Sequence, residues 1–342
     1  MESVSQYSQI IRRRKQFLFI LAIVFVVIFI IDIMVGSSSL TMVETVKIIF
    51  EGPKENERYN AIIWGIRLPM ALTCVCVGAS LGLAGVQMQT ILNNPLASPY
   101  TLGVSSAAGF GAAFSIVFGF PYLSPSWINI PVSAMIFSLL ASAMIALASK
   151  RMENNDTKSM ILFGVIMNFF FAALQTLMQY ISNQSQTTEI LHWLFGSLAK
   201  ANWLGVLICS SVFLIIFLIS LRYNWQLTAL SVGEDRAKSL GIRTNKLRII
   251  VFILSALLIA AAVSYVGSIG FIGLVAPHFA RTYMGEDQRY LAPMSAFFGV
   301  ILLLTASILS KIVIPGIIIP VGIITNLVGV GFLAYLMLRR KI

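Results

Sequence analysis

The sequence has 342 residues, of which 58% are hydrophobic and only 11% charged. A mean hydropathy of +0.89 excludes a soluble globular protein, in which about 25% of residues are charged. The formal net charge of +11 would suggest nucleic-acid binding in a soluble chain, but here membrane topology explains it and we expect no nucleic-acid partner. The composition therefore predicts an all-α, polytopic membrane protein.

Apolar stretches of spanning length predict about ten transmembrane helices, because each helix needs roughly 20 residues to cross the hydrocarbon core. Hydropathy alone would merge the seventh and eighth and give nine. No cleavage site for a secretory signal follows the first stretch, and no linker divides the chain, so we expect a single domain over 1–342 with its membrane-spanning region at 17–338. The predicted spans are 17–36, 64–92, 101–119, 130–149, 159–182, 204–222, 248–267, 270–284, 291–311 and 319–338.

The segment 37–63 has room for structure outside the membrane. Thr41 and Glu44 have the spacing of a capping box, in which each residue caps the other's backbone N–H, and an apolar run follows them. This pattern predicts a short helix on the outer surface.

Small residues recur in the second predicted span, where Gly78, Gly82 and Gly85 share one face. Glycines let a neighbouring helix backbone approach closely, so we interpret this face as a packing surface.

The fifth predicted span carries one polar stripe. Asn168, Gln175, Gln179 and Ser182 stay within roughly 40° of one line when each residue turns the helix by about 100°. Polar groups at membrane depth face protein or water, so the stripe either lines the translocation path, which we favour, or makes hydrogen bonds between helices.

Between the sixth and seventh spans, the loop 223–247 carries residues that typically begin and end a helix. Ser231 and Glu234 have capping-box spacing, Asp235 adds negative charge to the first turn, and Gly241 is placed to end the helix in a left-handed cap. We therefore predict a short helix over 232–240. It either binds a partner or lies idle on the membrane surface.

The stretch 267–281 combines glycines with a proline in an apolar segment. Gly267, Gly270 and Gly273 permit close packing, and Pro277 cannot donate to the carbonyl of Gly273, so we expect a kink there.

Basic residues divide unequally between the two faces. If both termini are cytoplasmic, 18 of the 24 Lys and Arg residues lie inside, the inner face carries +11 and the outer face is neutral. This division satisfies the positive-inside rule and predicts that both ends are cytoplasmic.

The chain has no GxxxxGK[ST] phosphate loop, so any ATP must be used by a partner chain. Cys74, Cys76 and Cys209 fall within spans and form no CxxC pair, and we interpret them as packing residues. His192 and His278 lie on opposite sides of the membrane, so we expect neither a metal site nor a bound cofactor.

Several motifs resemble, in order, the FecCD- and BtuC-like permease subunits of bacterial ATP-binding-cassette (ABC) importers for iron-siderophore complexes, haem and vitamin B12. The resemblance covers about residues 60 to 340. The matching stretches are Arg67-Leu68-Pro69, Asn94-Pro95-Leu96-Ala97, Leu102-Gly103-Val104-Ser105-Ser106, Trp193-Leu194-Phe195-Gly196-Ser197-Leu198, Ala237-Lys238-Ser239-Leu240-Gly241, the run 267–281 and Pro320-Val321-Gly322.

The resemblance implies roles for two surfaces. Arg67, and Lys311 at the outer end of the ninth helix, would contact carboxylates of an extracytoplasmic binding protein, although Met70 replaces a second motif arginine. Other departures from the family pattern are Asn93, Ser307, Ile318 and Gly331. The element that would dock into the ATPase subunit is Gly233, Glu234, Asp235, Arg236, Ala237, Lys238, Ser239, Leu240 and Gly241.

We therefore expect the permease subunit of an importer in the cytoplasmic (inner) membrane. Its partners would be lipid, ABC ATPase subunits, a binding protein and a second permease subunit, identical or related. Ferric siderophore is the favoured cargo, followed by cobalamin and haem. An ATP-independent secondary transporter would need a buried coupling carboxylate, and a membrane enzyme would need a catalytic constellation. The sequence offers neither at mid-membrane, since Asp32 lies near the outer end of its helix.

Overall fold

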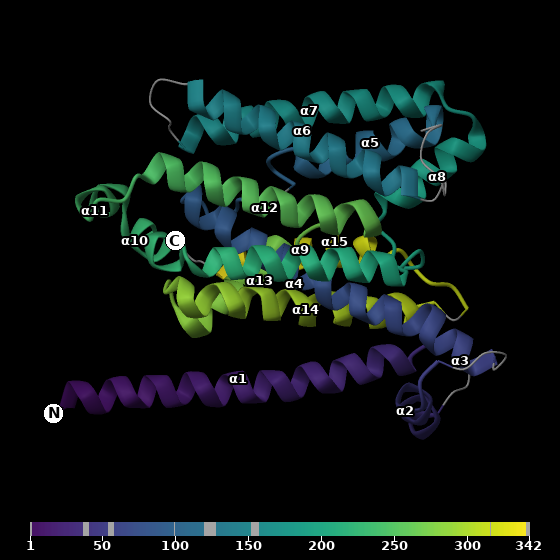
Figure 1. Cartoon of the computed structure of the whole chain (residues 1–342), viewed down its shortest axis with the longest axis horizontal. Coiled ribbons are helices and arrows are strands. Elements are labelled where there is room, and N and C mark those ends of the chain that lie inside the picture. The colour runs from purple at the N-terminus through teal and green to yellow at the C-terminus, as the bar shows by residue number, and fades with distance from the viewer. Residues whose placement is uncertain are drawn as a thin grey trace.

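The computed structural model describes residues 2–36, 41–53, 58–98, 100–119, 128–151, 157–314 and 316–339. Within these ranges the regular structure is helical throughout, with no strand, which confirms the predicted all-α class. The long helices lie side by side, and most run along the long axis of the molecule (Figure 1).

Each predicted span corresponds to a helix in the described ranges. Arg58–Ile91 is continuous, with α3 (Arg58–Ile62), a π-helical turn η1 (Ile63–Arg67) and α4 (Leu68–Ile91). The remaining helices at predicted spans are α1 (Glu2–Met34), α5 (Val104–Phe118), α6 (Asn129–Arg151), α7 (Thr157–Ile181), α9 (Trp203–Leu221), α12 (Thr244–Val266), α13 (Ile272–Met284), α14 (Gln288–Ile312) and α15 (Val321–Arg339).

Helix length divides these spans into two groups. Seven helices in the described ranges are long and apolar enough to cross a membrane, and they include α1 from Gln16 onward. The apolar parts of α5 and α15, Val104–Phe118 and Val321–Tyr335, are shorter, and α13 has 13 residues. The apolar parts of α5 and α15 and the whole of α13 therefore fall short of the roughly 20 residues that cross the hydrocarbon core.

The buried centre of the bundle is α4, which packs against α14, α12, α13 and α9. Its glycines allow this contact. A Cβ atom at Gly78 would lie 2.6 Å from the carbonyl oxygen of Gly299, and at Gly82 and Gly85 it would overlap the carbonyls of Ser295 and Gly273. The predicted packing role of this face is therefore confirmed. Because α4 is enclosed on all sides, it shows no amphipathic pattern.

The glycine-rich stretch differs from a single kinked helix. Residues 267–271 are non-helical, with φ of +75° at Gly267 and +65° at Phe271, and α13 begins at Ile272. The close approaches at Gly267 and Gly270 are to the Trp193 carbonyl and to the side chain of Asn326, and the Gly273 carbonyl lies against Gly85. Pro277 lies inside α13. The break between α12 and α13 rules out the merged, nine-helix alternative.

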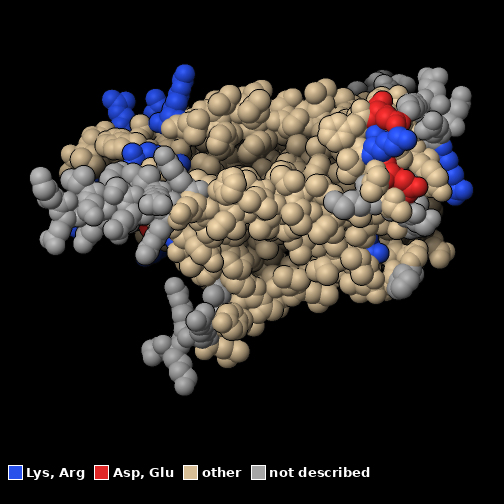
Figure 2. Space-filling model, turned by 90° about the horizontal axis from the view of Figure 1, so that it is seen from below, with Lys and Arg blue, Asp and Glu red and all other residues tan. Residues whose placement is uncertain are grey.

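The two ends of the bundle carry different short helices. The N-terminal end of α1 and the C-terminal end of α15 lie at the same end as α10 (Asn224–Val232) and α11 (Glu234–Ser239), whereas α2 (Met42–Glu51) and α8 (Gln184–Leu194) lie at the opposite end (Figure 1). Lys, Arg, Asp and Glu side chains gather near the two ends, and uncharged surface separates them (Figure 2). This uncharged band is the surface expected to meet lipid.

The outer helix predicted from its capping box is α2. Thr41 Oγ1 accepts from the Glu44 N–H at 3.3 Å, and Glu44 Oε2 accepts from the Thr41 N–H at 2.9 Å. α8 was not predicted, although Asn183 and Gln186 form the same kind of reciprocal cap at its start. The N-x-x-Q spacing was present in the sequence and would have revealed it.

Candidate coupling site and neighbouring surfaces

The loop 223–247 folds as two short helices joined at Gly233, not as one helix over 232–240. The φ of Gly233 is +140°, a conformation that favours glycine. The predicted Ser231–Glu234 capping box is wrong, because Ser231 lies in the last turn of α10 and its hydroxyl donates to the Thr228 carbonyl. A serine inside a helix bonds back to its own helix, and α11 begins without a side-chain cap.

The predicted left-handed cap at Gly241 is confirmed. Its φ is +80°, the Gly241 N–H donates to the Lys238 carbonyl, and the Ile242 N–H donates to the Ala237 carbonyl. These two bonds form a Schellman motif, which satisfies the last carbonyls of the helix. The end of α11 is therefore fixed by its own sequence.

Glu234, the first residue of α11, is the centre of a charged cluster. Its carboxylate is 2.6 Å from Arg248 Nη2 and 2.9 Å from Lys238 Nζ, and it accepts from the Thr244 hydroxyl at 3.3 Å. The hydrogen bond from Arg248, followed by the one from Lys238, lowers the pKa of Glu234 to about 2. Sequence reasoning found Glu234 but missed Arg248, which it counted only as one more inner basic residue.

The outward side of this segment is exposed and mixed in character. Ala237 is fully buried, whereas Asp235, Arg236, Lys238 and Ser239 are exposed. Three large apolar side chains at the same loop are also more than half exposed: Trp225 at 59%, Val232 at 56% and Leu240 at 58%. Apolar side chains beside charges, at an end of the molecule where the short helices lie outside the lipid-facing band, form the kind of surface that a protein partner covers.

At the opposite end, Arg67 and Lys311 line one groove of about 710 Å³. Arg67 Nη1 donates to the carbonyl oxygens of Ile33 and Met34 at 3.0 and 2.8 Å. Lys311 Nζ lies 2.7 Å from Asp32 Oδ1, and the two side chains are 4% and 0% exposed. Both basic groups are thus bonded within the chain, and their docking role stays a prediction.

The polar stripe of α7 faces α5 along part of its length. Asn168 accepts a hydrogen bond from the Ser106 hydroxyl, and the Gln175 side-chain amide lies against Gly109. Ser182 donates to the Gln179 carbonyl, and all four stripe residues are half-buried. The contacts of Asn168 and Gln175 match the interhelical alternative, and the translocation-path role remains untested.

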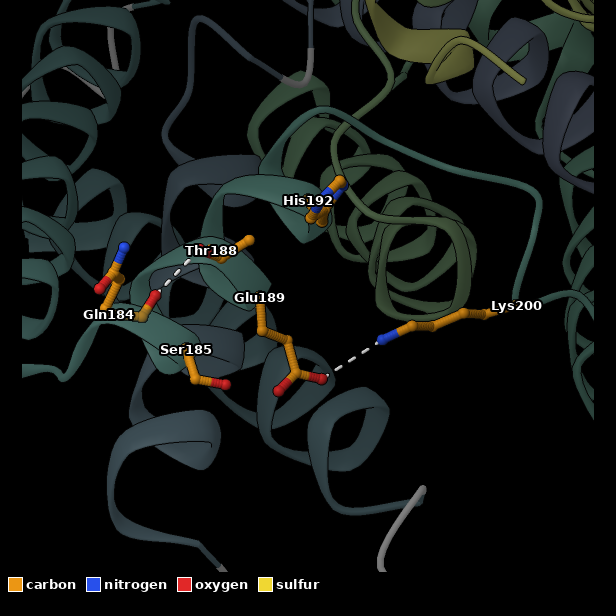
Figure 3. Close-up of a pocket in the computed structure, with 6 residues that line it drawn as sticks. All are labelled: Gln184, Ser185, Thr188, Glu189, His192 and Lys200. Atoms are coloured by element: carbon orange, nitrogen blue, oxygen red, sulfur yellow. Dashed lines mark hydrogen bonds and ion pairs between the residues drawn. The ribbon is translucent and has the colours of Figure 1, made fainter. Parts of the chain in front are cut away.

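A polar pocket of about 670 Å³ lies along α8 and was not foreseen. Glu189 and Lys200 point toward each other across it and form an ion pair at 3.3 Å (Figure 3). No helix was predicted over 183–203, so there was no reason to place these polar side chains together. The pocket is lined by Gln184, Ser185, Thr188, Glu189, His192 and Lys200.

The three predicted packing cysteines, Cys74, Cys76 and Cys209, are buried and free. Burial in an apolar interior makes such thiols inert packing groups.

Comparisons with known proteins agree with this architecture. The model of the FecCD transport family matches residues 23–339. The hemin transport system permease HmuU of Yersinia pestis is 37% identical over 82% of this chain and 84% of its own length, and the molybdate import permease MolB of Haemophilus influenzae is 33% identical over 95% and 96%. A solved ABC transporter of metal-chelate type, in an inward-facing conformation, superposes with a TM-score of 0.83 at 32% identity, covering 95% of this chain and 99% of that one.

The helical bundle, together with its similarity to the hemin and molybdate permeases and to the metal-chelate transporter, identifies the chain as a permease subunit of an ABC importer. The chain belongs to the FecCD transport family.

Proposed function

We propose that this chain forms half of the pore of an importer in the cytoplasmic (inner) membrane, with both termini inside. A second permease subunit completes the pore, ABC ATPase subunits bind the end that carries α11, and an extracytoplasmic binding protein delivers cargo to the end that carries α2 and α8. The chain itself needs no ATP site in this arrangement.

The observation that carries the proposal is the surface around α11. Its backbone is fixed by Gly233 and the Schellman motif at Gly241, yet Val232 and Leu240 leave apolar area exposed beside charged residues. An idle helix on the membrane surface would bury its apolar side chains in lipid. Here they flank Arg236, Lys238 and other charges, which favours a protein partner.

The orientation follows from charge. Both termini lie at the same end as α11, and so does the excess of Lys and Arg over Asp and Glu. The positive-inside rule places such an end in the cytoplasm. An ATPase partner must also lie there, because ATP is cytoplasmic. Both arguments give the same orientation.

The favoured cargo is a ferric siderophore, with haem and cobalamin as alternatives. The similar proteins include a hemin permease and a metal-chelate transporter, which supports an iron chelate. The molybdate permease shows that a relative can serve a small oxyanion, so molybdate belongs among the test substrates.

A secondary transporter receives no support from the buried acid in the described part of α1. Asp32 is fully buried but is paired with Lys311 at 2.7 Å, so its charge is already compensated. A proton- or sodium-coupling carboxylate must instead change its charge or ligands during transport.

The test is uptake into proteoliposomes that contain the chain with its ATPase and binding protein. We expect ATP-dependent uptake of radiolabelled iron as a ferric siderophore, with haem, cobalamin and molybdate measured in parallel. The variants Gly241→Pro and Glu234→Lys with Arg236→Glu should insert normally but lose substrate-stimulated ATPase activity. Lys150→Glu, at an exposed side chain in the last turn of α6 that belongs to neither docking surface, is the control. Uptake driven by a proton or sodium gradient without ATP would refute the proposal.

A further inference from the structure

We propose that Arg248 is a positioning residue that transmits movement of α11 to the inner end of α4. The inference rests on the proposed function of α11 and adds the route by which its displacement enters the bundle. The contacts of Arg248, Gln288 and their partners support it.

Arg248 joins two elements that are distant in sequence. Its Nη2 donates to Glu234 Oε2 at 2.6 Å, and its Nε donates to the Ile91 carbonyl oxygen at 3.1 Å. Ile91 is the last residue of α4, and a helix ends with carbonyls that have no intrahelical partner. One planar guanidinium therefore holds the start of α11 and the end of α4 at a fixed separation.

Burial strengthens this link. The Arg248 side chain is 9% exposed, whereas the neighbouring Lys238 is 56% exposed. A charge-assisted hydrogen bond shielded from water is stronger and less mobile than an exposed one. Although both side chains bind Glu234, Arg248 makes the rigid contact.

A second route reaches the same turn of α4. The Thr228 hydroxyl of α10 accepts from the backbone N–H of Gln288 at 2.9 Å, and Gln288 Nε2 donates to the Thr90 hydroxyl at 2.9 Å. The two helices flanking Gly233 are thus each connected to the last turn of α4, at Thr90 and Ile91. Because α4 is the most enclosed helix, a shift of its end must move its packed neighbours.

The substitution Arg248→Gln tests the link in the reconstituted complex. We expect normal assembly and basal ATPase activity, with cargo transported per ATP falling by about tenfold or more, as for loss of one charge-assisted hydrogen bond. Arg248→Lys, whose point charge cannot serve both partners, should be intermediate. The swapped pair Glu234→Arg with Arg248→Glu should recover part of the transport that each single charge change loses. Arg222→Gln removes an exposed basic side chain outside the docking element, so it is the control and should stay within about twofold.

Amide hydrogen exchange gives a readout that does not depend on transport. In the isolated chain, Arg248→Gln should speed exchange in the last turn of α4, and Lys238→Gln should not. Faster exchange with wild-type transport per ATP would refute the transmission role, and unchanged exchange would refute the link itself. If the wild-type complex shows no ATP-dependent uptake, the proposed function fails and the exchange result alone decides the link.

Discussion

The buried pair of Asp32 and Lys311 yields a quantitative prediction. Lys311 Nζ contacts both the carboxylate and the backbone carbonyl of Asp32, at 2.7 and 2.9 Å, and ties the C-terminal end of α1 to α14. The second carboxylate oxygen, Asp32 Oδ2, is buried with no hydrogen-bond partner. Its desolvation is therefore incompletely compensated, and the pair fixes geometry more than it adds stability.

Removing one member should cost far more than removing both. Lys311→Met leaves a fully buried carboxylate without its cation, and breaking a buried pair in this way typically costs about 3–5 kcal/mol. The double variant Asp32→Leu with Lys311→Met leaves no charge to compensate. Its free energy of unfolding should lie within about 1 kcal/mol of the wild type or above it.

Denaturant unfolding in detergent micelles measures these differences through a double-mutant cycle. Wild-type stability for Lys311→Met, or a double variant no more stable than the single one, would refute the reasoning. The same variants also test docking. If the double variant keeps its stability but weakens affinity for the binding protein by about tenfold or more, the docking role predicted for Lys311 is supported.

Four further outcomes follow from the structure. Gly82→Val should prevent α4 from packing on α14, at a cost of at least about 1–3 kcal/mol, seen as loss of monodisperse protein in gel filtration. Gly241→Ala strains a φ of +80° by about 1–2 kcal/mol and should speed amide exchange in α11, whereas Gly241→Asn should not. Because the pKa of Glu234 is lowered, the stability that its ionised form contributes is complete above about pH 4.5 and is lost as the pH falls toward 2. The Glu234–Arg248 pair should therefore give no inflection in transport between about pH 5 and 8. In intact cells, a cysteine at Ser239 should resist impermeant thiol reagents and one at Lys47 should react, and the reverse pattern would contradict the orientation.

The sequence predicted the helices well because spanning length and apolarity are local properties. Gly241 was also predictable, since a left-handed cap depends on a few adjacent residues. Ser231 misled because its capping-box spacing gave no sign that α10 begins at Asn224 and already contains it. The spacing of two residues does not decide in which of two adjacent helices a residue lies.

Pairings between distant residues escaped prediction. Lys311 was predicted to contact a binding protein, but its partner within the chain is Asp32, which is 279 positions away. Arg248 likewise bonds Ile91, 157 positions earlier. Such contacts depend on which helices pack together in the bundle, and the residues near each partner in the sequence do not indicate this.

The enclosure of α4 means that its packing can be completed only after later helices have been synthesised and inserted. α4 is synthesised early, with Gln87 among its residues, but the hydroxyls that satisfy Gln87 belong to Ser220 and Ser255, which the ribosome adds much later. Ser295, whose hydroxyl donates to the Gly82 carbonyl, comes later still. The Gln87 side chain and the Gly82 carbonyl of a newly inserted α4 therefore lack these partners until α9, α12 and α14 are added. A chain that is truncated before α14 lacks Ser295, so the Gly82 carbonyl has no hydroxyl partner and the packing around α4 stays incomplete.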